Sequence, residues 1–436
     1  MYYILMHKNS QVAFCKDEQV LKVLRKEMLP IGTTFDGKKY NLKKWFNSRM
    51  IPTSRNNYSV IEEWIKTTPV KMSQFHLHNY GMSINDCYWF YKVKTPLHFK
   101  LMQNKKMASK IPSYDKISLY GHFESSDSPL QVLAENKITL PDMINLKYPD
   151  STTGGDITKY WTVRQDQYFI VKQNHPKNPL TAEKIIASQI LCDIINNTRM
   201  NLNSKKADIE TASYFFEPGK TPIESCCYAK CFTDSINGLT TWSQIEAQQG
   251  KTMSIEEMRD FINPTSIQLR EYFDFIILFD YLTENKRTKD DIGFIISNDS
   301  NRIIKPAPLY SFSKTFDYLE KDYERVYKKE ELGDYVNVFG MTMEEQVNYI
   351  ANIDWMDNRE LFQNIGELKD YFETDADRRQ LTLTNLETIC NVLNHKLYHI
   401  ENKKYEIAEA EGTLEELGFE KRDDDEDDDY EDDSSY

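Results

Sequence analysis

Charged and amide side chains follow one long apolar segment of the chain, between residues 274 and 296. The apolar run ends near Glu284, and a strand-like segment, Phe-Ile-Ile, begins after Gly293. A helix that leads through a polar loop into a strand is typical of the loop that orients a hydroxyl group and binds magnesium in phosphoryl-transfer enzymes. The polar side chains that could do this chemistry are Asn285, Lys286, Arg287, Lys289, Asp290 and Asp291.

Two upstream segments could contact a phosphate group. Gly154 and Gly155 lie in a turn-rich stretch, and Lys172 ends a strand-like segment. Glycines let backbone N–H groups approach a phosphate, and a lysine supplies a positive charge. Glu183, in the first turn of a predicted helix, is the type of residue that would hold such a lysine. An ordinary α+β domain with a solvent-facing Lys172 explains these residues equally well, so both interpretations stay open at this point.

The elements that must position these residues follow from hydrophobic periodicity. Alternation over residues 159–173 predicts a β-hairpin that turns at 164–167. Apolar spacing over 180–196 predicts an amphipathic helix. Strands are expected at 214–216 and 227–232, and mainly helices after Trp242.

The first hundred residues predict a small mixed domain. Residues 2–6 and 11–14 read as strands, and Glu18 to Met28 as an amphipathic helix that ends before Pro30. A short helix and turn are expected around Trp45. The basic, polar residues 103–110 predict a linker or exposed loop.

The acidity of the chain is concentrated at its C-terminal end. A helix is predicted from Leu386 to Glu411, and residues 423–433 then contain ten acids in eleven positions. The other 58 acidic residues nearly balance the 54 basic ones, which argues against direct nucleic-acid binding. The tail is expected to be disordered. It either keeps the protein soluble or attracts a basic partner.

Cysteines and histidines give no strong metal motif. The seven cysteines are an odd number at irregular spacings, which predicts free thiols in a reducing cytoplasm. A zinc site at Cys226, Cys227 and Cys231 would lack a second ligand pair. His395 and His399 share one helix face without the glutamate of a zinc protease, so packing is the expected role of this helix. No secretory leader is expected, and the longest apolar run is too short to span a bilayer.

Several segments resemble the HipA-like serine/threonine kinases, in particular long bacterial members with an extra N-terminal domain. The resemblance spans roughly residues 20 to 320 and implies a two-lobed kinase fold that uses ATP and Mg²⁺ to phosphorylate Ser or Thr of a protein. It makes Gly154 and Gly155 part of the nucleotide loop and Lys172 the phosphate-contacting lysine. Matching on Ile-Ile-Ala-Ser places Lys184, instead of Glu183, at the family's glutamate position. The matching segments are LPIGT near Leu29, WFNSRMIPTSR near Trp45, SINDCYW near Ser83, YPDSTTGGDITKYW, IIAS at Ile185 and the loop after Asp280.

The chain departs from the family at the catalytic loop. The family pattern is similar to D-x-x-x-x-N-x-D-R-H-x-x-N-F-G, and the aspartate before Arg287, the family's catalytic base, is missing here. Thr288 replaces the histidine, and Asp291 replaces a metal-binding asparagine but could still hold magnesium. Ser311 stands where the family has its second metal ligand, an aspartate. Losing both the base and a metal carboxylate should lower the rate by several orders of magnitude.

The predicted fold is α+β: a two-lobed, protein-kinase-like domain behind a small mixed N-terminal domain. Residues 1–110 form the N-terminal domain, and residues 111–420 the kinase-like domain, divided near residue 235 into a small lobe and a helical large lobe. Residues 421–436 are the acidic tail.

The leading functional hypothesis is a cytoplasmic pseudokinase that binds ATP and Mg²⁺ weakly or not at all. It would act by binding a protein partner, basic or DNA-binding, in a regulatory or toxin–antitoxin-type role. The first alternative is an active serine/threonine kinase in which Asp290 or Asp291 fills the vacant roles and Asp317 is the second metal ligand. The second alternative is a regulator that works beside a DNA-binding partner, with the acidic tail imitating nucleic acid.

Overall fold

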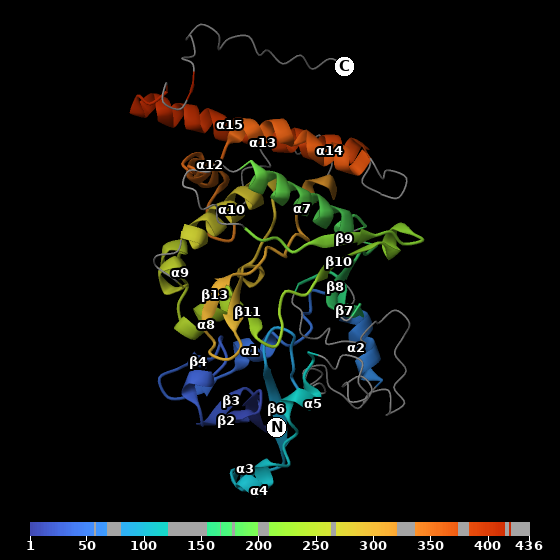
Figure 1. The fold of residues 1–436 in the computed structure, drawn as a ribbon, viewed down its shortest axis with the longest axis vertical. Coiled ribbons are helices and arrows are strands. Elements are labelled where there is room, and N and C mark those ends of the chain that lie inside the picture. The colour runs from blue at the N-terminus through green and yellow to red at the C-terminus, as the bar shows by residue number, and fades with distance from the viewer. Residues whose placement is uncertain are drawn as a thin grey trace.

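The computed structural model describes residues 1–55, 58–67, 80–120, 155–165, 167–176, 179–198, 209–262, 267–320, 336–373, 383–414 and 418–419. These residues form three antiparallel sheets and a set of helices (Figure 1). Their mixed helix and strand content agrees with the predicted α+β class. Within the described residues, none of the helices combines the length and apolar character needed to cross a bilayer. The acidic tail and Gly154 lie outside the described residues.

The N-terminal sheet has six strands in the order β4-β5-β3-β2-β1-β6. Both of its faces are covered, because Trp45 and Phe46 pack on one side of β1 and Phe99 and Met102 on the other. The strands predicted at 2–6 and 11–14 are confirmed as β1 and β2. The strands are β1 Tyr2–His7, β2 Ser10–Lys16, β3 Gln19–Val23, β4 Thr34–Phe35, β5 Tyr40–Asn41 and β6 Tyr88–Val93.

Short helices surround this sheet. The helix expected around Trp45 is confirmed. The prediction that residues 103–110 form a loop is wrong in part, because Asn104 caps a short helix by accepting a hydrogen bond from the Lys106 N–H at 2.9 Å. The helices are α1 Lys43–Asn47, α2 Tyr58–Lys66, α3 Pro96–Met102, α4 Lys105–Ala108 and α5 Tyr114–Ile117.

The helix predicted from Glu18 to Met28 is also wrong. This segment forms β3 and then a single 3₁₀ turn, Lys26–Met28. In β3, Val20 pairs with Cys15 and Val23 with Ala13 of β2. Pairing with an existing strand satisfies the backbone and buries Val20, so tertiary context outweighs the local helical pattern.

The second sheet has the order β7-β8-β10-β9 and carries the long helix α7, Thr181–Asn197. The hairpin predicted over 159–173, the helix and both later strands are confirmed. Tyr214, Cys227 and Ala229 face α7 and share one hydrophobic core with it. The strands are β7 Lys159–Arg164, β8 Gln167–Gln173, β9 Tyr214–Glu217 and β10 Cys226–Lys230.

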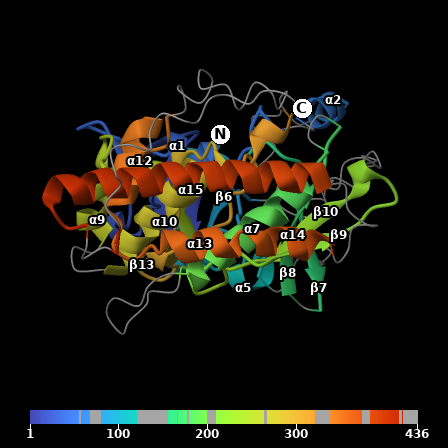
Figure 2. The ribbon, with the colours of Figure 1, turned by 90° about the horizontal axis from the view of Figure 1, so that it is seen from above.

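The third sheet, β11-β12-β13, lies next to the helical part of the chain. The predicted strand after Gly293 is confirmed as β12. Helix α10, Ile267–Thr283, is central to the core, and its side chains from Phe275 to Phe279 are fully buried. The long helix α15 lies at one end of the molecule (Figure 1) and packs against α10, α12, α13 and α14 (Figure 2). The remaining elements are β11 Asn237–Thr241, β12 Gly293–Ser297, β13 Ile303–Pro306, α8 Trp242–Gln249, α9 Ile255–Ile262, α12 Met343–Ala351, α13 Asn358–Asn364, α14 Gly366–Glu373 and α15 Leu383–Glu411.

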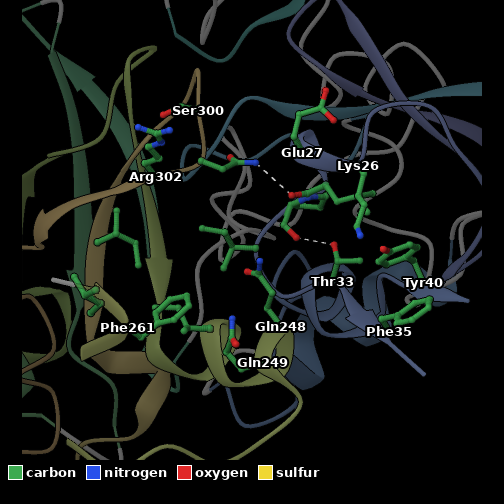
Figure 3. A pocket seen from close by; sticks show the side chains of 17 residues that line it. Lys26, Glu27, Thr33, Phe35, Tyr40, Gln248, Gln249, Phe261, Ser300 and Arg302 are labelled. Carbon is green, nitrogen blue, oxygen red and sulfur yellow. Dashed lines mark hydrogen bonds between the residues drawn. The ribbon is translucent and has the colours of Figure 1, made fainter. Parts of the chain in front are cut away.

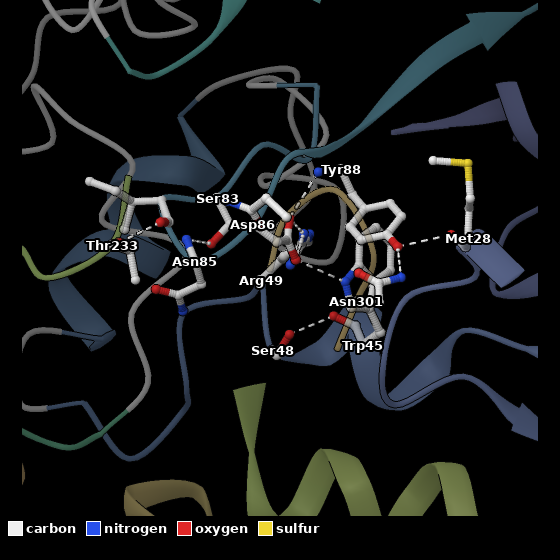
Figure 4. Close-up of polar contacts among 12 residues, drawn as sticks. Met28, Trp45, Ser48, Arg49, Ser83, Asn85, Asp86, Tyr88, Thr233 and Asn301 are labelled. Carbon is white, nitrogen blue, oxygen red and sulfur yellow. Dashed lines mark hydrogen bonds and ion pairs between the residues drawn. The ribbon is translucent and has the colours of Figure 1, made fainter. Parts of the chain in front are cut away.

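A buried ion pair connects the segment after α1 to the segment that leads into β6 (Figure 4). The guanidinium of Arg49 donates to Asp86 Oδ2 at 2.6 Å and lies 3.8 Å from the ring centroid of Trp45. The Trp45 indole N–H also donates to Asp86, at 3.3 Å. These residues therefore have a clear structural role.

The N-terminal sheet is joined to the rest of the chain by direct polar contacts. Asn301, in the turn between β12 and β13, donates to the Tyr88 hydroxyl at 2.6 Å (Figure 4). The Thr233 hydroxyl donates to the carbonyl oxygen of Ile84 at 2.7 Å. The predicted domain boundary near residue 110 remains a prediction, because these contacts do not define where one folding unit ends.

Replacing Asp86 by Ala should destabilise the protein by about 3–5 kcal/mol, because Arg49 would remain buried without its counter-charge. Urea unfolding followed by circular dichroism measures this change. The control is Glu62→Gln, which removes an exposed i,i+4 partner of Lys66 and should cost less than about 0.5 kcal/mol. Equal effects of the two substitutions would show that the Asp86 cluster does not stabilise the sheet.

Candidate functional site

Lys172 lies where the second sheet meets the helical part of the chain. Its ammonium is buried and donates hydrogen bonds to the Tyr214 hydroxyl at 2.5 Å and to the Tyr310 carbonyl at 2.8 Å. The Tyr214 hydroxyl also donates to that carbonyl, at 2.6 Å. Among the described residues no ion pair joins Lys172 to Glu183, which is buried in the first turn of α7. The assignment of Glu183 to a nucleotide site therefore stays a prediction.

The surroundings of Lys172 make its positive charge costly. Burial lowers the pKa of the lysine to about 8, although the Cys227 thiol and the Asp291 carboxylate act in the opposite direction. Its two hydrogen-bond acceptors are neutral oxygens, which compensate a buried charge less well than a carboxylate does. A further negative charge next to the ammonium would reduce this cost.

A second lysine lies directly opposite Lys172. Lys159 on β7 pairs with Lys172 on β8, and both residues are buried. The charge of Lys159 acts on the neighbouring Asp156. Burial alone would raise the pKa of this carboxyl, but hydrogen bonds from Ser54 and Lys314 and the charges of Lys314 and Lys159 lower it. Gly155 lies close to Lys159. Its backbone is in the left-handed conformation, with φ of +90°, and a Cβ at this position would lie 2.8 Å from Lys159 Nζ. Only glycine therefore fits here without displacing the Lys159 side chain.

The polar loop after α10 is anchored by a buried ion pair. Arg287 donates to Asp280 through Nε at 2.8 Å and through Nη2 at 3.0 Å, and both side chains are almost fully buried. The Asn285 amide donates to Asp280 Oδ1 at 3.0 Å and to the Ser311 carbonyl at 3.1 Å. The predicted catalytic side chains Asn285 and Arg287 thus have structural partners in this loop.

Asp291 and Ser311, the two positions predicted to face the metal, are in direct contact. The Ser311 hydroxyl donates to Asp291 Oδ1 at 2.6 Å, while Oδ2 accepts from the N–H and hydroxyl of Thr288 at 2.9 and 2.7 Å. Burial alone would raise the pKa of Asp291, but these hydrogen bonds and the Arg287 charge outweigh it and lower the pKa. Asp291 is therefore an ionised carboxylate whose two oxygens already have donors. Within the described ranges, no cluster of three or more His, Cys, Asp or Glu side chains has the geometry of a metal site.

The other acidic residues near the loop contact positive charges or hydroxyl groups. The Asp290 carboxylate accepts hydrogen bonds from Ser243 and Thr241, at the start of α8, and lies 3.7 Å from Lys44 of α1. Asp290 is thus directed toward α8 and the N-terminal sheet.

Asp317 also contacts positive charges. Its carboxylate pairs with Lys184 at 3.1 Å and with Lys286 at 3.5 Å. The hypothesis that Asp317 is the second metal ligand would require both ion pairs to break.

The sequence analysis did not identify three residues of this site: Lys159, Tyr214 and Tyr310. The position of Lys159 could have been deduced, because a hairpin that turns at 165–166 places it opposite Lys172. No sequence pattern near the two tyrosines predicts their contacts with Lys172, since these contacts join residues 42 and 138 positions apart.

A separate cleft of about 640 Å³ opens between the N-terminal sheet, helices α8 and α9 and the β12–β13 turn (Figure 3). Phe35 and Tyr40 lie on one side of it and Phe261 on the other, with Gln248 and Gln249 between them. None of the predicted site residues lines this cleft.

Comparisons with known proteins give structural matches only. No family model matches the chain, and no curated protein matches its sequence. A proinflammatory kinase from Helicobacter pylori, CtkA, is 12% identical with a TM-score of 0.41, over 59% of this chain and 97% of the kinase. HipA from Shewanella oneidensis MR-1, from a toxin–antitoxin complex with HipB and operator DNA, is 10% identical with a TM-score of 0.46, over 92% of this chain and 97% of HipA. Because both TM-scores are below 0.5, these similarities carry no functional argument.

Replacing Lys172 by Met should change stability in a pH-dependent way. The folded-state pKa of the lysine lies below its unfolded value, so burial of the ammonium costs free energy below about pH 8 and this cost falls as the pH rises toward 10.5. The stability of the Met variant relative to wild type should therefore fall by about 2 kcal/mol between pH 7 and pH 9.5.

Urea unfolding at the two pH values measures this difference. Lys66→Met, which removes an exposed lysine, corrects for general effects of pH on the protein. A relative stability of the Lys172 variant that stays constant with pH would contradict the buried, charged state of this lysine.

Proposed function

We propose that this chain is a kinase-fold protein with a degenerate catalytic centre, a pseudokinase of HipA-like type. The sheet β7–β10 with α7 is its small lobe, and the helices around α10 belong to its large lobe. The proposal is carried by the direct contact of Ser311 with Asp291, close to Lys172. In a kinase this place is occupied by a metal carboxylate, a second metal ligand and the phosphate-binding lysine.

The chemistry of the loop supports impaired phosphoryl transfer. Transfer needs a group that orients the attacking hydroxyl and metal ions that neutralise the phosphates. Lys286 and Arg287 pair with Asp317 and Asp280, and the Asp290 carboxylate contacts α8. A serine hydroxyl is also a weaker ligand for magnesium than a carboxylate is.

Weak nucleotide binding without efficient transfer is the state that this site favours. Lys172 supplies a buried positive charge close to Asp291, and a phosphate group is a fitting partner for such a lysine. Asp291 is the carboxylate nearest to Lys172 in this loop, but both of its oxygens already accept hydrogen bonds, so we expect it to bind Mg²⁺ weakly.

We further propose that the protein acts by binding a protein partner in a regulatory or toxin–antitoxin-type role. The support is compositional: ten acids in eleven residues near the C-terminus present a dense negative charge to a basic or DNA-binding protein. Near-neutral charge over the remaining residues disfavours direct contact with nucleic acid.

Incubation with ATP and Mg²⁺, followed by intact-mass measurement, tests the loss of phosphoryl transfer. The expected result is no phosphate on the chain or on a generic serine-rich substrate, while ATP raises the melting temperature of wild type more than that of Lys172→Met. Phosphate incorporation that Lys172→Met abolishes would contradict the pseudokinase proposal and establish an active kinase.

Replacing Ser311 by Asp tests whether this position is a vacant metal site. Two adjacent carboxylates repel each other, so the variant should be less stable than wild type without metal and should regain stability with Mn²⁺. Its Mn²⁺ affinity should exceed that of wild type at least tenfold, measured by calorimetry. Ser311→Asn is the neutral control. No gain of Mn²⁺ binding in the Asp variant would show that Ser311 does not face a metal site.

A further inference from the structure

The outward face of α15 carries two histidines, and the sequence favoured an ordinary packing helix over a metal site for them. The inward face of the helix packs into the core through Leu386, Ile389, Leu393, Leu397 and Ile400. His395 and His399, in contrast, are exposed on the side away from that core. Packing into the core therefore accounts for the inward face of the helix.

The two imidazole rings converge on one point. Their Nε2 atoms lie 3.0 Å apart, the ring centroids are 4.5 Å apart, and the rings are nearly perpendicular, at 88°. Residues four apart lie on one face of a helix, one turn from each other, so the backbone of α15 holds this spacing. The rings can exchange one hydrogen bond through Nε2, or both Nε2 atoms can point their lone pairs at a shared ion.

The spacing of the nitrogens favours one coordination geometry. Metal–imidazole bonds of about 2.0–2.1 Å to two nitrogens 3.0 Å apart enclose an angle of about 90° at the metal. This is the angle between adjacent ligands of a tetragonal or square-planar ion, whereas a tetrahedral zinc ion would need a wider separation.

We propose that His395 and His399 form a two-imidazole binding site for a divalent transition metal of tetragonal geometry, copper(II) or nickel(II). Imidazole is a good ligand for both ions, and copper(II) should bind more tightly than nickel(II). The two imidazole nitrogens would occupy two adjacent coordination positions, and further ligands would complete the coordination. The inference is independent of the proposed kinase-like function.

The neighbouring positive charge on α15 is directed away from the two histidines. The Lys396 ammonium is buried on the opposite side, where it pairs with Glu284 at 3.0 Å.

Titration of the untagged, chelator-treated full chain with Cu²⁺ tests the site, by calorimetry and electron paramagnetic resonance. Wild type should bind one copper ion with two equivalent imidazole nitrogens in its spectrum. His395→Gln and His399→Gln should each weaken this binding at least tenfold and remove the two-nitrogen signature. The matched control is His98→Gln, a single histidine on α3, which should leave both readouts unchanged.

Two outcomes would overturn the proposal. The first is copper binding that neither histidine substitution weakens, which would place the ion elsewhere, for example at the chain's amino terminus. The second is binding that His98→Gln weakens as much as the α15 substitutions do, which would show unspecific binding to histidines. Both α15 variants should keep the wild-type circular dichroism spectrum, because both positions are exposed.

Discussion

The buried ion pair between Asp280 and Arg287 determines the shape of the loop on which the account depends. Two fully desolvated charges are tolerated only with good geometry and additional hydrogen bonds, and here Arg287 contacts both carboxylate oxygens while Asn285 adds a third donor. This arrangement fixes the chain directly after α10. Asp291 then follows in a short 3₁₀ turn, Lys289–Asp291, that brings its carboxylate to Ser311. The residues that could have performed catalysis are therefore the residues that stabilise the loop.

The loop also lies between the second sheet and the N-terminal part of the chain. On one side, Lys172 of the second sheet contacts the Tyr310 carbonyl, next to Ser311. On the other side, Lys44 of the N-terminal part approaches Asp290, and Lys289 pairs with Glu246 of α8 at 2.6 Å. Consecutive acidic residues thus face different partners, and their roles could not be exchanged without rebuilding the turn.

Local patterns predicted much of this structure from the sequence. The hairpin over 159–173, helix α7 and strand β12 were correct because their periodicity agrees with their tertiary environment. The segment from Glu18 to Met28 was predicted wrongly because pairing with β2, which the local pattern does not report, decides its conformation. In the candidate site, the resemblance to a kinase family predicted the loss of a metal carboxylate at Ser311, and this stays a prediction. The hydrogen bonds of Lys172 to Tyr214 and Tyr310 depend on long-range contacts that no spacing along the chain reveals.

The central claim is that Asp291 and Ser311 form a kinase-like metal position that no longer binds magnesium effectively. Calorimetric titration of ATP into the protein, once with Mg²⁺ and once with a chelator, tests it most directly. The account predicts that Mg²⁺ does not increase the affinity for ATP, because Ser311 supplies no second carboxylate and both oxygens of Asp291 already accept hydrogen bonds. An affinity that rises tenfold or more with Mg²⁺ would contradict the account and show a functional metal site.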